Sequence, residues 1–127
     1  MMVAGLNLWL GWTSVLGGVL SGAIIGLLFH REDWLGGYNS FPRRLVRLGH
    51  ISFFGLGILN ILFALSAGTL HLSGSYLQVS SAAFVVALVT MPICCFLTAW
   101  RKPLRHLFPV PVGAAAIGVI ALLIGAS

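Results

Sequence analysis

The sequence predicts an all-α membrane protein, a single domain in which four transmembrane helices form an antiparallel bundle. Of its 127 residues, 59% are hydrophobic and only 7% are charged, and the mean hydropathy is +1.06. A soluble domain carries roughly a quarter charged residues, so most of this surface must face lipid or other protein. All seven Lys and Arg residues lie in two short segments, and the apolar stretches around these segments are long enough to cross a bilayer.

Four apolar stretches have the length of a membrane span. The first three would rise roughly 33 to 36 Å as helices, and the fourth about 25 Å. Because the connections are short, neighbouring helices are expected to run antiparallel. The expected spans are residues 6–29, 49–70, 77–100 and 110–126, joined by inner loops at 30–48 and 101–109 and an outer turn at 71–76.

The basic residues also predict the orientation. Both basic loops lie on one side of the four-span arrangement, and the turn at residues 71–76 has no Lys or Arg. The positive-inside rule then places both loops inside and both termini outside, most simply in a bacterial inner membrane. The bases flank spans, so we expect anionic lipid headgroups and not nucleic acid as their partners. The expected headgroup-binding residues are Arg43, Arg44, Arg47, Arg101, Lys102 and Arg105.

The first inner loop carries a helix-start signal. Ser40 precedes Phe41 and Pro42, a pattern typical of an N-cap followed by proline in the first turn. The second helix is therefore expected to begin near Phe41, in the headgroup zone, with its arginines extending towards phosphates. Glu32 and Asp33, the only acidic residues, are expected to pair with these arginines.

Small residues recur along the spans at four-residue intervals. Glycine on one face lets helix backbones approach closely, which favours helix association in lipid. This pattern predicts close packing but does not say whether the partner helix belongs to this chain or to another. The expected packing residues are Ser14, Gly18, Gly22 and Gly26 in the first span, and Gly118 and Gly125 in the fourth.

One face of the second span is the best candidate for a cofactor. His50, Gly57, Ala64 and His71 recur at seven-residue steps with Asn60 beside them, so they share one narrow helix face. Cytochrome b-like bundles combine imidazole ligands from facing helices with glycine where the macrocycle passes. This face indicates haem b, or alternatively a quinone.

A six-coordinate haem needs a second axial ligand. His30 or His106 would supply it at the inner side, whereas His71 at the outer side has no histidine partner. The alternative without a cofactor is that these histidines lie at the membrane interface and form hydrogen bonds with loops and lipid headgroups. The wide spacing of the histidines does not favour a zinc site, which usually shows tight ligand spacing or thiolates, so we assign no metal.

Other chemistries find little support in the sequence. Coupled transporters generally place an ionisable group inside the membrane, but no span core here contains Asp, Glu, Lys or Arg. Asn60, Thr90 and Ser66 are the notable polar residues in the spans, and Asn60 is expected to bond another helix. No carboxylate pair, activated serine or phosphate-binding loop is present, so we do not expect an enzyme.

The leading functional hypothesis is a small non-catalytic membrane subunit of a larger complex, such as a respiratory or other electron-transfer assembly. It depends on three observations: no soluble domain, no charge within the spans, and small-residue ridges that suit other transmembrane subunits as partners. A haem b- or quinone-binding electron carrier that uses His50 with His30 or His106 is the alternative. A small channel or transporter that depends on Asn60 is the third hypothesis.

Overall fold

The computed structural model describes residues 2–127, and this part of the chain is helical without strands. Four segments are long and apolar enough to cross a membrane; the fourth, Lys102–Gly125, joins a short 3-10 helix to the last α-helix. The chain thus has the architecture of a multi-pass integral membrane protein. Its elements are α1 (Met2–Leu28), η1 (Trp34–Gly36), α2 (Phe41–Thr69), α3 (Gly74–Trp100), η2 (Lys102–Leu107) and α4 (Pro109–Gly125).

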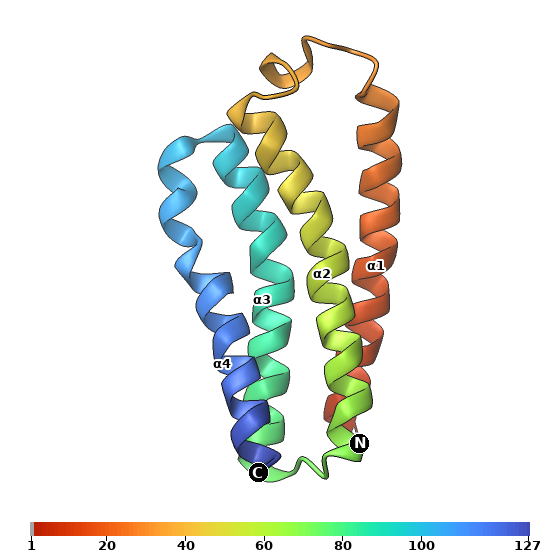
Figure 1. Ribbon diagram of the computed structural model, residues 1–127, viewed down its shortest axis with the longest axis vertical. Helices are drawn as coiled ribbons and strands as arrows, with labels where there is room; N and C mark the ends of the chain where they lie inside the picture. Colours follow the sequence, from red (N-terminus) through yellow and green to blue (C-terminus); the bar gives the residue numbers. More distant parts are fainter. Residues whose placement is uncertain (1) are drawn as a thin grey trace.

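The four long helices lie side by side in chain order (Figure 1). The extensive helix–helix contacts in the described chain join α1 to α2, α2 to α3, α3 to α4 and, more weakly, α1 to α3. Helix α4 therefore packs mainly on α3, at one edge of the row. Both chain ends and the α2–α3 turn lie at one end of the molecule, and the two basic connections lie at the other (Figure 1).

Helix α2 begins at Phe41, as the sequence predicts. The backbone of the Ser40 N-cap is extended, and its hydroxyl accepts a hydrogen bond of 3.3 Å from the backbone N–H of Arg43. Pro42 lies in the first turn, where its missing N–H costs no helical hydrogen bond. Helix α2 therefore starts eight residues before the expected span at 49–70, and α1 and α3 also begin a few residues earlier than expected.

Glycines bring α1 and α2 into close contact. A Cβ atom on Gly11 would lie 2.7 Å from the backbone oxygen of Gly57, and one on Gly57 would lie 2.9 Å from that of Gly11. Further along the helix, Gly18 faces the Phe54 ring and Gly22 faces the His50 ring at similarly short range. Side chains at these positions would force the two backbones apart, which is the reason for glycine in this interface.

The half of the molecule that holds the chain termini contains a small apolar core. The rings of Phe63 of α2 and Phe84 of α3 pack at a tilt with their centres 5.2 Å apart, and both residues are 2% exposed. Helix α4 reaches this core through Gly118, where a Cβ atom would lie 2.8 Å from the Phe84 ring, and through Gly125, which lies against Tyr76. Among the glycines predicted to pack, Gly26 alone has no neighbour, since a Cβ atom there would meet nothing within 4 Å.

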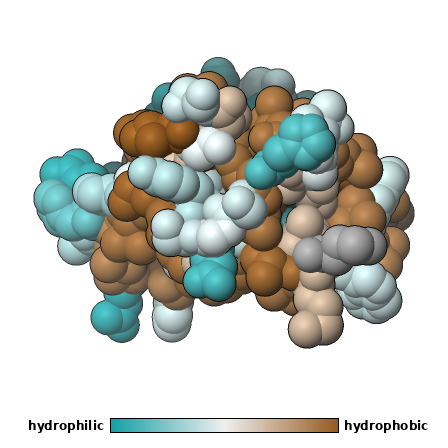
Figure 2. Space-filling model, turned by 90° about the horizontal axis from the view of Figure 1, so that it is seen from below, coloured by the Kyte–Doolittle hydropathy of each residue, from teal (hydrophilic) through white to brown (hydrophobic). Residues whose placement is uncertain are grey.

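The end of the molecule that carries the termini has few charged residues. Figure 2 looks onto this end, and hydrophilic residues there occur in small groups among hydrophobic ones. The turn begins with Leu70 and His71, and His71 has a left-handed backbone (φ 51°), a conformation that usually favours glycine. Leu72, which follows it, is buried.

Candidate functional site

A buried polar cluster joins the first three helices. Asn7 donates hydrogen bonds to the side-chain oxygen of Asn60 (2.7 Å) and to the backbone oxygen of Ser81 (3.2 Å). The Ser81 hydroxyl donates back to the side-chain oxygen of Asn7. Asn60 in turn donates to the backbone oxygens of Leu56 (2.9 Å) and Phe84 (3.1 Å). Asn7 and Asn60 are fully buried, so helix packing holds this cluster out of contact with lipid.

The cluster leaves no amide hydrogen of either asparagine free. Asn60 is thus hydrogen-bonded to α1 and α3, as its place in the second span predicts. Sequence reasoning missed Asn7, although an asparagine inside a predicted span was a usable signal, because polar residues in spans usually face protein. Thr90 bonds within its own helix, to the backbone oxygen of Val86.

His50 lies on the face of α2 that packs against α1. Its Nδ1 atom is 2.9 Å from the hydroxyl oxygen of Ser21, and its ring meets Phe54 edge-on with centres 5.4 Å apart. The Ser21 hydroxyl donates its single proton to the backbone oxygen of Gly18 (3.0 Å).

The other histidines lie apart from His50. His30 is exposed beyond the end of α1, and its Nδ1 donates to the backbone oxygen of Leu27 (2.8 Å). Gly22, the residue that faces His50, precedes His30 by eight positions, or roughly 12 Å along a helix. His106 is exposed in η2. Within residues 2–127, no group of three or more His, Cys, Asp or Glu side chains is placed to hold a metal ion.

The predicted cofactor face of α2 divides into two parts. At Gly57, where a macrocycle was expected to pass, the backbone of α1 is in contact at Gly11. His50 is likewise covered by Gly22. The part of this face nearer the start of α2 is therefore a helix–helix interface, whereas Ala64 and His71, near its end, line a cavity.

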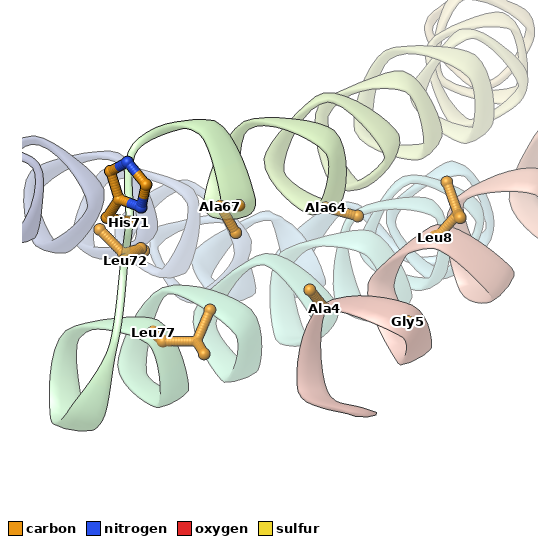
Figure 3. A pocket seen from close by; sticks show the side chains of 9 residues that line it. Ala4, Gly5, Leu8, Ala64, Ala67, His71, Leu72 and Leu77 are labelled. Atoms are coloured by element: carbon orange, nitrogen blue, oxygen red, sulfur yellow. The ribbon is translucent and has the colours of Figure 1, made fainter. Parts of the chain in front are cut away.

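This cavity, of about 430 Å³, lies between the start of α1, the end of α2 and the start of α3 (Figure 3). Small residues line much of the cavity: Ala4 and Gly5 of α1 face Ala64 of α2 (Figure 3). Leu72 and Leu77 close the cavity at the α2–α3 turn. Apart from the His71 imidazole, the lining side chains are apolar. The cavity can accept an apolar group, but it offers no pair of chemical groups for catalysis.

Arg43 departs from the expected headgroup contact. It is only 2% exposed, and its guanidinium lies over the rings of Phe29 (5.1 Å), Trp34 (5.4 Å) and Tyr38 (5.5 Å). We call these three rings the aromatic cage. Cation–π attraction is strongest where water is excluded, so the cage compensates the buried charge and keeps this arginine away from lipid phosphates.

Arg43 does not form the expected ion pair with Glu32 or Asp33. It donates to the backbone oxygens of Arg31 (3.5 Å) and Glu32 (3.4 Å), and its Nε atom is buried without a partner. Its role is to hold the α1–α2 connection against the start of α2. Of the other bases, Arg47 lies 4.4 Å from the Tyr38 ring centre, and Arg44 is exposed.

Comparisons with protein-family models, curated proteins and solved structures find no match to this chain. A proposal about its function therefore depends on its own residues and their packing.

Proposed function

We propose that this protein is a small non-catalytic subunit of a larger membrane complex, with both termini outside and the two basic loops inside. The helices would form an antiparallel arrangement in a bacterial inner membrane, with anionic lipids at the inner surface. An electron-transfer assembly, such as a respiratory complex, is the proposed kind of complex. Other transmembrane subunits are the proposed partners.

This proposal is supported by glycines at helix positions where packing within the chain does not require them. Gly11, Gly57 and Gly118 are required by packing within the chain, because a Cβ atom there would lie less than 3 Å from a neighbour. By contrast, a Cβ atom on Gly26 or Gly55 would meet nothing within 4 Å. The same is true of Gly113 on α4.

Glycine costs a helix about 1 kcal/mol relative to alanine, so internal packing gives no reason for glycine at these three positions. In lipid, however, exposed glycine provides the close approach that a partner helix needs. The position of α4 at the edge of the row, packed mainly on α3, leaves a further face for such a helix.

The buried polar groups agree with a structural role. Asn7, Asn60 and Ser81 bond one another between helices, and the spans contain no charged side chain in their cores. A group that is already fully hydrogen-bonded in the interior is a poor candidate for binding a substrate.

The test is purification from native membranes in a mild detergent, with mass spectrometry of what co-migrates at stoichiometric yield. We expect the wild-type chain to co-migrate with other membrane subunits. Gly26→Leu, Gly55→Leu and Gly113→Leu should each fold but lower that yield if the position faces a partner. Val79→Leu, a bulk increase at an exposed non-glycine position, is the matched control. Migration of the wild-type chain alone would refute the proposal.

The second candidate is a haem b- or quinone-binding electron carrier. One observation favours it: Nδ1 of His30 donates to the backbone oxygen of Leu27, which leaves its Nε2 available as a ligand. This candidate expects a haem absorption band in the purified chain that is lost in His50→Ala. A colourless preparation from native membranes would exclude the haem form.

A further inference from the structure

The short helix η2 arranges three basic side chains around one hollow. Lys102, Pro103, Arg105 and His106 line a hollow of about 260 Å³ at the end of the molecule opposite the chain termini. A 3-10 helix has three residues per turn, so Lys102 and Arg105 lie one above the other on the same face. No acidic residue lines the hollow.

A contact with helix α2 helps to hold the Lys102 side chain in position. Its Nζ atom lies 5.4 Å from the ring centre of Phe41, the first residue of α2. Pro103 lies in the first turn of η2 and fixes its backbone there. Arg105 and His106 are exposed. The hollow thus differs from the environment of Arg43, whose charge is compensated by the aromatic cage.

We expect the hollow to lie near the depth of lipid headgroups. Helix α3 has 27 residues and so rises about 40 Å, which exceeds the hydrocarbon core by about 10 Å. Helix η2 packs against α3 and returns beside its last turns (Figure 1). Trp100, the last residue of α3, is 78% exposed, as is typical of an aromatic ring at the membrane interface.

We propose that this hollow binds the phosphate group of an anionic phospholipid. Charge complementarity selects the ligand: the basic side chains of Lys102 and Arg105 and an imidazole line the hollow, and no carboxylate does. A zwitterionic lipid would bring an ammonium group close to Lys102 and Arg105, which repel it. The proposal rests on the membrane placement of the proposed function, because that placement puts lipid phosphates beside η2.

The test uses the purified full chain, stripped of lipid in detergent and titrated with phosphatidylglycerol, with native mass spectrometry to count bound lipids. We expect one tightly bound lipid, and we expect Lys102→Gln and Arg105→Gln each to weaken its binding about tenfold, the effect of one lost charged hydrogen bond. Lys102→Arg should retain binding. Arg31→Gln removes one exposed charge outside the hollow and is the matched control.

Three results would overturn the proposal. Equal weakening by Arg31→Gln would mean that only net charge attracts lipid. Equal binding of phosphatidylcholine would remove the selectivity, and displacement by millimolar inorganic phosphate would identify a soluble anion as the ligand. A circular dichroism melt of each variant excludes unfolding as the cause. The isolated chain is used, so these results do not depend on whether partner subunits co-migrate.

Discussion

Asn7 of α1 and Asn60 of α2 share a hydrogen bond of 2.7 Å in the fully buried interior. Asn7 also exchanges hydrogen bonds with Ser81, so this contact fixes α1 against both α2 and α3. Lipid offers no water to replace a lost partner, and sliding one helix by a turn would leave several polar groups unbonded. The pair therefore sets the register of the first three helices.

Removing either asparagine should destabilise the protein. We expect Asn7→Ala and Asn60→Ala each to cost about 1 to 2 kcal/mol, because each change removes more than one interhelical hydrogen bond and one such bond is worth about 0.6 kcal/mol on average. The double variant should cost less than the sum, because each single change already breaks the shared bond. Thermal unfolding in detergent, followed by circular dichroism, measures all three. Strict additivity would show that the pair is not coupled.

A methyl group at the α1–α2 contact should also destabilise the protein. In Gly11→Ala the new Cβ atom would lie 2.7 Å from the backbone oxygen of Gly57, so the helices must separate, at a cost of about 1 to 3 kcal/mol. Gly5→Ala is the matched control on the same helix: nothing lies within 4 Å, and the better helix propensity should stabilise it slightly. Equal melting temperatures for the two variants would contradict the packing shown for Gly11.

Loss of the Arg43 guanidinium should loosen the α1–α2 connection. Arg43→Gln removes the charge from the aromatic cage, and with cation–π contacts worth about 0.5 to 2 kcal/mol each, local opening should rise at least tenfold. Amide hydrogen exchange across residues 29–40 measures this, and Trp34 fluorescence should shift to longer wavelength. Arg44→Gln, at an exposed neighbour, should leave both readouts unchanged. Unchanged exchange in Arg43→Gln would refute this role for the cage.

The proposed orientation predicts which cysteines an impermeant reagent can reach. In a background of Cys94→Ala and Cys95→Ala, Ser73→Cys in the α2–α3 turn should be labelled in intact cells. Asn39→Cys in the first basic loop should be labelled only after the membrane is permeabilised, because the positive-inside rule places it inside. Both native cysteines are buried, so their removal also lowers background labelling. The reverse labelling pattern would contradict the proposed orientation and place the basic loops outside.

Several features were predictable from local sequence. Long apolar stretches with two basic connections give four spans, and Ser40 with Pro42 gives the start of α2, because length, hydropathy and capping act within a few residues. Ser14, Gly18 and Gly22 do lie on one face towards α2, since a four-residue interval returns to the same side of a helix.

Which groups meet across helices was not predictable from the sequence. The four-residue spacing predicts the same packing role for Gly22 and Gly26. Only Gly22 contacts a neighbouring helix, because α1 and α2 are in contact over only part of their length. The sequence likewise groups Arg43 with the other arginines, whereas the fold buries it in an aromatic cage formed by the connection.

The sequence by itself determined the spans, the membrane class and the distribution of charge, since these follow from composition along one chain. The tertiary structure alone decided that Asn7 bonds Asn60, that the His50 face meets α1, and that Lys102 and Arg105 share a hollow. The physical reason is that such contacts depend on helix rotation and depth. These are set jointly by close backbone packing between elements far apart in the chain.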